Sequence, residues 1–231
     1  MNVLTFDIED WFHILDNESS NNIKKWDKYE PRIHRNMDFI FESLEKNNIK
    51  ATFFCLGWIA EKYPEIIRSI DERGYEIGSH TYYHQLIFNQ RKKDFDYDLK
   101  KSIDVISNLT GKKVKYFRAP GFSIKEENLW ALETIANNGI EIDCSIFPAS
   151  RSHGGLPSFN TCQPSIISYN DIEIKELPIS YYKFLSVPII FSGGGYFRFF
   201  PFSIIKYLFK KNKYNMTYFH PRDFDPSQPI I

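Results

Sequence analysis

Hydrophobic residues recur at helical spacing along several stretches of the chain. Apolar side chains fall three or four residues apart in Arg32–Leu44, in Phe95–Leu109 and in Leu129–Ala136. Two further helices are predicted over Pro64–Arg73, which starts with proline, and near Phe202–Phe209.

Short apolar runs rich in β-branched and aromatic residues lie between these helices. Asn47-Asn48 suits a left-handed helix end, and Gly74, Gly111 and Gly139 close three further helices before the strands that follow. Repeated helix–glycine–strand units predict an α/β fold with a parallel sheet, open or closed into a barrel. The predicted strands are Val3–Phe6, Ala51–Leu56, Tyr75–Gly78, Val114–Phe117, Ile140–Ile142 and Met216–Phe219.

The regular pattern fails between residues 145 and 201, where Pro and Gly are frequent. Within this stretch, Tyr169–Leu177 alternates in polarity like a β-hairpin. We interpret 145–201 as a loop and hairpin insertion layer on a single catalytic domain that spans residues 1–231.

Composition excludes several classes of protein. The 231 residues are 42% hydrophobic, enough for a sizeable core, and 29 basic residues balance 29 acidic ones, which argues against a global attraction to nucleic acid or acidic membranes. Three widely spaced Cys argue against a disulfide framework. With no leader pattern or membrane-spanning run, a cytoplasmic location is expected by default, and the oligomeric state stays open.

Candidate reactive residues follow the predicted strands. In a parallel barrel these strand ends share one face, which is where such folds build active sites. Acids, histidines and an arginine at five strand ends are hard to explain as ordinary solvent-exposed surface residues. The residues are Asp7, Glu9, Asp10, His80, His84, Arg118, Asp143 and His220.

Two of the histidines have the spacing of a metal site. His80 and His84 form a His-x3-His pair, which on a helical turn places both imidazoles on one side of a metal. A carboxylate from Asp7, Glu9 or Asp10 would complete a three-residue ligand set with an open position. Two unrelated surface histidines are the alternative interpretation.

The other polar residues suggest acid–base chemistry. Crowded carboxylates after a buried strand need a cation or an Arg to offset their charge, so one would bind metal and another would act as general base. His220 can protonate a leaving amine, with Asp143 fixing its tautomer. A hydrogen-bonded structural histidine is the alternative for His220. His13, beside the acid cluster, is a weaker candidate for a substrate contact.

These residues resemble the polysaccharide deacetylase family, also called the NodB-homology fold or carbohydrate esterase family 4. The resemblance runs from Leu4 to about Pro229 in five motifs, and longer segments resemble a subgroup associated with bacterial exopolysaccharides and surface glycans. The motif segments are TFDIED (5–10), SHTYYH (79–84), RAPG (118–121), DCS (143–145) and FHP (219–221).

The resemblance implies a distorted (β/α) barrel with fewer than eight regular βα units. It also implies a divalent metal, with Zn²⁺ favoured by the nitrogen and oxygen ligands. Many members have two adjacent Asp residues, base then ligand, but Ile8 replaces the second one here. Relatives with Asp-x-Asp or Asp-x-Glu place the ligand two residues on, so Glu9 is the first choice for the metal carboxylate and Asp10 the alternative.

The expected reaction is hydrolysis of an acetyl group, N-linked by preference, from a sugar of a bacterial polysaccharide or glycan precursor. Asp7 would act as base, positioned by Arg118, and His220 as acid, oriented by Asp143. The Gly121 N–H would hold the oxyanion. Sugar-stacking candidates are Trp11, Phe122 and Tyr196, with the run Gly193–Gly195 allowing a close approach of the backbone to the sugar.

Other functions stay open at this point. The same site would serve a hydrolase of another amide or of an O-acetyl ester, and a non-catalytic glycan-binding module is a third alternative. The sequence does not distinguish a polymeric, a lipid-linked or a nucleotide-sugar substrate.

Overall fold

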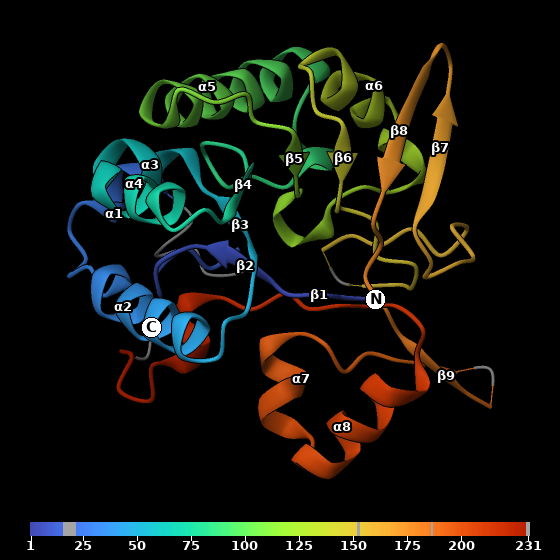
Figure 1. The fold of residues 1–231 in the computed structure, drawn as a ribbon. Coiled ribbons are helices and arrows are strands. Elements are labelled where there is room, and N and C mark those ends of the chain that lie inside the picture. Colours follow the sequence, from blue (N-terminus) through green and yellow to red (C-terminus); the bar gives the residue numbers. More distant parts are fainter. Residues whose placement is uncertain (16–21, 152, 186, 230–231) are drawn as a thin grey trace.

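The computed structural model describes residues 1–15, 22–151, 153–185 and 187–229. Its centre is a seven-stranded sheet (Figure 1) in which six neighbouring strands run parallel and the last pairs antiparallel. In sheet order the strands are β2 (Thr5–Ile8), β3 (Thr52–Cys55), β4 (Glu76–Ser79), β5 (Tyr116–Phe117), β6 (Ile142–Asp143), β8 (Ile172–Glu176) and β7 (Ser165–Tyr169).

A C-terminal segment lies beside the first strands and curves the sheet toward closure. β1 (Asn2–Val3) pairs in parallel with β11 (Asn215–Met216), and the pairing continues as a bridge between Phe6 and Phe219. On the other side, Ser180 Oγ accepts a hydrogen bond of 3.1 Å from the Met216 N–H. The predicted distorted barrel is therefore confirmed. On the Ser180 side it is closed by this side-chain hydrogen bond.

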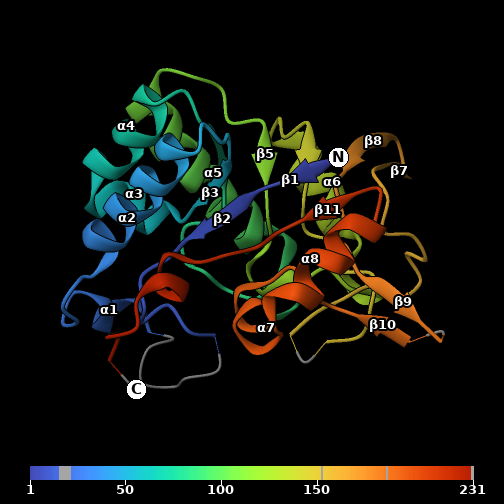
Figure 2. The ribbon, with the colours of Figure 1, turned by 60° about the horizontal axis from the view of Figure 1, so that its bottom comes forward.

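Helices pack around the outside of this sheet (Figure 1), while two more form a separate lobe with a small β-ribbon (Figure 2). The outer helices are α1 (Ile23–Trp26), α2 (Ile33–Lys46), α3 (Gly57–Lys62), α4 (Pro64–Glu72), α5 (Lys92–Thr110) and α6 (Trp130–Asn137). The lobe comprises α7 (Gly194–Phe199), α8 (Phe202–Lys211), β9 (Tyr182–Phe184) and β10 (Val187–Ile189). Short 3₁₀ turns are η1 (Ile87–Asn89), η2 (Pro120–Phe122), η3 (Glu126–Asn128) and η4 (Pro221–Phe224).

The predicted helices and strands are present, with ends displaced by a few residues. Gly74, Gly111 and Gly139 have φ of +67°, +67° and +83°, the left-handed conformation expected where the helices end. The sequence patterns did not predict α3 or α7, each of which has six residues. Among the described residues, no helix is long and apolar enough to cross a membrane.

The stretch 145–201 is more than an insertion layer. Its hairpin forms as predicted, but β8 pairs in parallel with β6 and so belongs to the main sheet. The reason lies in its alternation, because Ile174 and Glu176 are buried while Glu173 and Lys175 face solvent. Ser152 and Ser186, within this stretch, lie outside the described residues.

Candidate active site

A buried carboxylate and two histidines meet at the end of the parallel strands. Glu9 Oε1 lies 3.2 Å from His80 Nε2 and 2.9 Å from His84 Nε2. All three side chains are nearly inaccessible to solvent. Two strands thus bring together residues about 70 positions apart, because β2 and β4 flank β3 and end at the same edge of the sheet.

The histidines lie on an irregular loop, so the predicted helical turn is wrong. Thr81 and His84 have φ of +62° and +54°, which a helix does not allow. The carboxylate of Asp98, on α5, accepts hydrogen bonds of 2.7 and 2.9 Å from the N–H groups of Tyr82 and Tyr83. The buried Asp98 thus satisfies backbone donors that a helix would have paired, and it holds both imidazoles toward Glu9.

These residues fit a divalent cation. Ligand atoms of Glu9, His80 and His84 all lie within 4.8 Å of one another. The Arg118 carbonyl oxygen, 2.7 Å from His80 Nδ1, leaves His80 Nε2 free as a ligand atom. His84 Nε2 is buried without a well-aligned hydrogen-bond partner, although Glu9 is close. An unsatisfied imidazole nitrogen facing a carboxylate is the donor arrangement that a metal requires.

The electrostatics agree with this assignment. Burial alone would raise the pKa of Glu9, but His84, His220 and Arg222 hold it well below its usual range. Burial lowers the pKa of His84, which favours the neutral imidazole that binds metals. The site therefore keeps the carboxylate ionised and at least one imidazole neutral.

The structure distinguishes the two candidate carboxylates. Asp10 lies at the start of α2, where its Oδ2 accepts hydrogen bonds of 2.9 and 3.1 Å from the N–H groups of Arg32 and Ile33. Its Oδ1 accepts from the Trp11 N–H at 2.7 Å. Asp10 thus caps a helix and is not a member of the described metal-type clusters, whereas Glu9 belongs to both of them.

Asp7 lies beside the histidine cluster and is held by Arg118. The guanidinium Nη1 donates hydrogen bonds of 2.7 Å to Asp7 Oδ1 and to Thr5 Oγ1. Arg118 is fully buried, its Nε reaches the Cys144 carbonyl oxygen, and its guanidinium lies over the Phe54 ring at 4.2 Å. One oxygen of Asp7 is thereby fixed, while Oδ2 faces His220 Nε2 at 3.9 Å.

His220 has a carboxylate partner, but it is Asp223 and not Asp143. Asp223 Oδ2 lies 3.2 Å from His220 Nδ1 and accepts a hydrogen bond from the His220 N–H. Asp143 instead accepts a hydrogen bond of 2.5 Å from Ser145 Oγ and lies opposite Glu176 in the sheet. The predicted Asp143–His220 pair is therefore wrong, because the 3₁₀ turn after His220 supplies a nearer acid.

A cavity of about 310 Å³ opens over this cluster. Gly121 and Phe122, both predicted substrate contacts, line it, and Tyr196 lines an adjoining cavity of about 430 Å³. Trp11 lines neither cavity, and its Nε1 donates to the Glu30 carbonyl oxygen. The predicted stacking of Trp11 on a sugar is therefore wrong, since its ring packs against Phe12 and Tyr29.

The glycine run serves a different purpose from the predicted one. A side chain at Gly193 would overlap the Tyr218 ring, and one at Gly194 would overlap the carboxylate of Asp223. Gly193–Gly194 thus allow α7 to approach the strand segment and the turn that carry His220. The backbone at these glycines therefore lies close to Tyr218 and Asp223 of the protein itself, where the sequence predicted a close approach to a sugar.

Two arginines in the cavity were missed from sequence. Arg222 Nη1 donates a 3.0 Å hydrogen bond to Glu9 Oε2, and Arg151 lines both cavities with its guanidinium 4.5 Å from the Phe147 ring. Arg222 lies two residues after His220, a signal that the sequence offered. Nothing in the pattern around Arg151 distinguishes it.

His13, the weaker candidate for a substrate contact, is buried, and its Nδ1 accepts a hydrogen bond from the Asp10 N–H.

Comparisons with known proteins agree with this geometry. A family model described as polysaccharide deacetylase matches residues 3–140, and a second, described as a domain of unknown function (DUF3473), matches 144–231. A peptidoglycan-N-acetylglucosamine deacetylase of Bacillus cereus is 31% identical over 116 residues, which are 45% of this chain and 42% of that protein. The chain spans less than half the length of the first curated relatives it matches.

Solved structures share the fold. A Mycobacterium smegmatis protein assigned to the polysaccharide deacetylases has a TM-score of 0.69 at 18% identity, covering 96% of this chain and 78% of that one. A pseudoenzyme of carbohydrate esterase family 4 from Bacillus anthracis has a TM-score of 0.56 at 15% identity, covering 96% and 54%. The matched family model, the barrel and the histidine cluster together show that the chain belongs to the polysaccharide deacetylase family.

Proposed function

We propose that this protein is a metal-dependent hydrolase that removes an N-linked acetyl group from a sugar of a bacterial polysaccharide or glycan precursor. The observation that carries the proposal is the buried Glu9, His80 and His84 cluster with Asp7 and His220 on its open side. Glu9, His80 and His84 would hold a divalent cation, with zinc favoured by the ligand set. When bound, such an ion polarises a carbonyl and lowers the pKa of water.

Asp7 is the proposed general base. Arg118 holds its Oδ1, so that Oδ2 is the oxygen that can take a proton from the attacking water. Because the guanidinium is buried and also bonded to Thr5, the orientation of this carboxylate is fixed before substrate arrives.

His220 is the proposed general acid. Its Nδ1 is paired with Asp223, which leaves Nε2 directed toward Asp7 and Glu9 at 3.9 and 3.7 Å. A proton at Nε2 can therefore pass to the departing nitrogen of the sugar. Gly121, at the cavity wall, would offer its N–H to the oxyanion. Tyr196, which is 39% exposed, would contact the sugar rings, whereas the buried Phe122 would form part of the cavity wall.

The test combines metal analysis with a screen of acetate release from N-acetylated and O-acetylated sugars. Wild-type protein is expected to bind one metal ion and to release acetate together with a free sugar amine. Asp7→Asn should keep the metal and lower kcat by about 10²- to 10⁴-fold. Release of acetate from esters alone would establish the O-acetyl alternative, and undiminished activity of Asp7→Asn would refute the mechanism.

A further inference from the structure

The segment Leu177–Arg222 has a charge unlike that of the rest of the chain. It contains seven basic residues and no acidic one, although acids and bases balance over the whole protein. The remainder therefore has seven more acids than bases. The basic residues are Lys183, Arg198, Lys206, Lys210, Lys211, Lys213 and Arg222.

The same segment exposes large hydrophobic side chains. Phe199 and Phe202 are 80% and 69% exposed, and Tyr207 is 52% exposed. The core does not need them, because α8 already buries Ile205 and Leu208 against Phe191. Among the described residues, 13 large hydrophobic side chains are exposed, and the seven within this segment are Leu185, Tyr196, Phe197, Phe199, Phe202, Ile204 and Tyr207.

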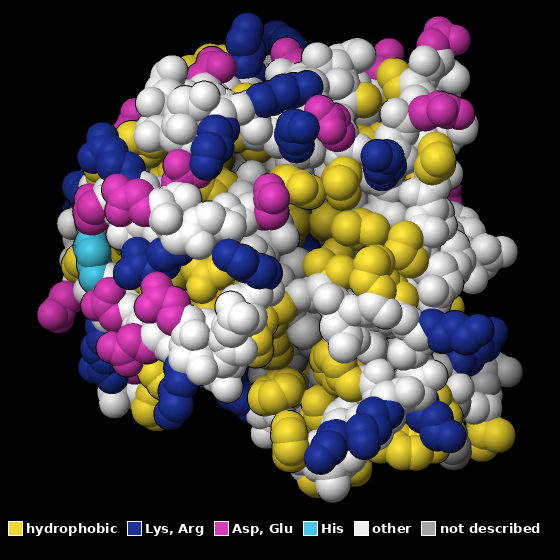
Figure 3. Space-filling view, viewed as in Figure 1, with side chains coloured by type: hydrophobic (Ala, Val, Ile, Leu, Met, Phe, Trp, Pro, Cys, Tyr) yellow, Lys and Arg dark blue, Asp and Glu magenta, His cyan; other side chains and the backbone are white. Residues whose placement is uncertain are grey.

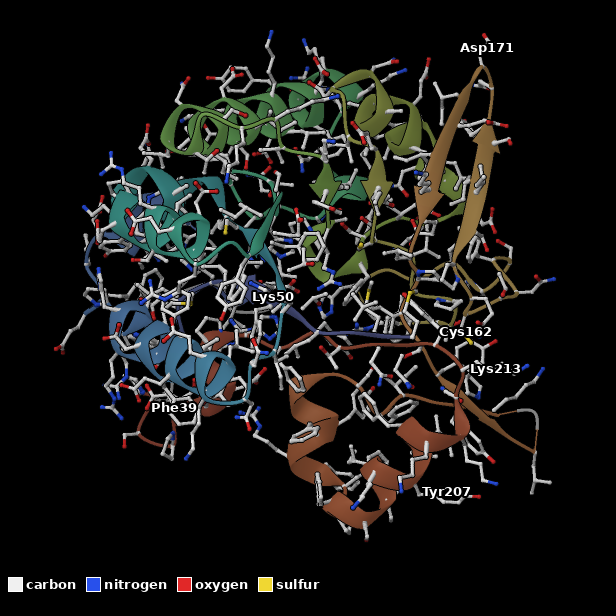
Figure 4. The ribbon with its side chains drawn as sticks, in the orientation of Figure 1. Phe39, Lys50, Cys162, Asp171, Tyr207 and Lys213 are labelled. Atoms are coloured by element: carbon white, nitrogen blue, oxygen red, sulfur yellow. The ribbon has the colours of Figure 1, made fainter. Side chains whose placement is uncertain are left out.

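These two properties coincide on one surface, formed by α7, α8 and the connection between them. Figure 3 shows hydrophobic and basic side chains without acidic ones on the lower part of the molecule, where Figure 1 places these helices. Tyr207, labelled in Figure 4, lies on α8 at the bottom of the view. Exposed aromatics flanked by lysines are typical of surfaces that lie in a membrane interface.

We propose that the surface formed by α7 and α8 docks on an anionic lipid bilayer. Phe199 and Phe202 would enter the boundary between headgroups and acyl chains, while Lys206, Lys210 and Lys211 would contact the anionic headgroups. A second copy of this chain fits less well, because a symmetric contact through this surface would bring like-charged lysines together without an acid to offset them.

The surface borders the substrate cavities. Tyr196, on α7, lines the 430 Å³ cavity, and Arg151 belongs to both that cavity and the one over the histidine cluster. A bilayer in contact with α7 would therefore lie next to the cavity entrance. If the proposed deacetylase function holds, a glycan attached to a membrane lipid is the substrate class that this placement favours.

Vesicle flotation tests the docking independently of catalysis. The purified protein is mixed with vesicles of phosphatidylcholine alone or with about 30% phosphatidylglycerol, at low salt and at about 0.5 M salt. Wild type should bind the anionic vesicles at least about tenfold better, with the preference lost at high salt. Phe199→Ser/Phe202→Ser should weaken binding about tenfold or more.

A second variant and a matched control sharpen the result. Lys206→Gln/Lys210→Gln/Lys211→Gln should lose the preference for anionic vesicles, whereas Phe39→Ser/Ile166→Ser, two exposed residues elsewhere, should bind like wild type. Failure of wild type to bind, or equal binding by the Phe variant, would overturn the proposal. So would a dimer in sedimentation that the Phe variant abolishes, since the surface would then be an interface between copies.

Discussion

Residues 1–143 and residues 144–229 contribute different things to one site. The first region consists of regular strand–helix units and places Asp7, Glu9, His80, His84 and Arg118 at its strand ends. The second is irregular, yet it adds β8 to the sheet and brings His220, which is paired with Asp223, to the same cavity. The two family models divide the chain at nearly the same place. The comparison teaches that the C-terminal strand segment that closes the barrel also carries His220, the proposed acid, to the proposed base.

Histidine variants in the two regions should separate metal binding from proton donation, and this is the largest expected effect. His80→Ala removes a proposed ligand and should abolish stoichiometric metal binding, with acetate release at least about 10³-fold lower. His220→Ala should retain the metal and lower kcat by about 10²- to 10⁴-fold. Metal analysis and steady-state kinetics on both variants check this, and metal loss in His220→Ala would show that both regions hold the ion.

A substitution in the glycine run should displace Asp223, the partner of His220, without touching the proposed metal ligands. In Gly194→Ala the new methyl group would overlap the Asp223 carboxylate and push it from His220. We expect kcat to fall about 10- to 100-fold with the metal retained. The control is Gly195→Ala, whose side chain would meet open space and should leave kcat unchanged. Equal kinetics for the two variants would contradict a role for the close approach.

Glu176 and Asp143 lie opposite each other where the two regions join. Burial raises the pKa of Glu176 well above its usual range and the Asp143 charge raises it further, so the folded protein holds a proton there that the unfolded chain releases. Stability should therefore fall as pH rises above the ordinary Glu pKa. Glu176→Gln should reduce this dependence and raise the free energy of unfolding at pH 8 by about 1–3 kcal/mol. Denaturant unfolding at pH 5 and 8 checks it; a variant less stable than wild type at pH 8 would refute it.

The hydrogen bond between Ser180 and Met216 is one of the contacts that close the barrel. Ser180 Oγ is the partner of the Met216 N–H, so Ser180→Ala leaves a buried donor unpaired and should cost about 1 kcal/mol of unfolding free energy. Ser168→Ala, on the exposed side of the hairpin, should change stability by less than about 0.5 kcal/mol. An equally small effect at Ser180 would show that this side-chain link does not stabilise the barrel.

The sequence predicted the first region better than the second for a physical reason. Strands buried on both faces and helices with one apolar stripe leave periodic patterns, so the residues that follow them were identified by position alone. The Asp223 partner of His220, the cap formed by Asp10 and the placement of Arg151 depend on tertiary contacts, which leave no period in the chain. The loop of His80 and His84 was mistaken for a helix because Asp98, 14 residues beyond His84, determines its shape.

Arg118 links the folding of this protein to its chemistry. The side chain is fully enclosed, and it contacts Asp7 on β2, the Phe54 ring on β3, the Cys144 carbonyl oxygen and the sulfur of Met216 on β11. One guanidinium therefore fills the barrel interior and aligns the proposed base. Loss of this side chain would therefore disturb the packing of the barrel as well as the orientation of Asp7.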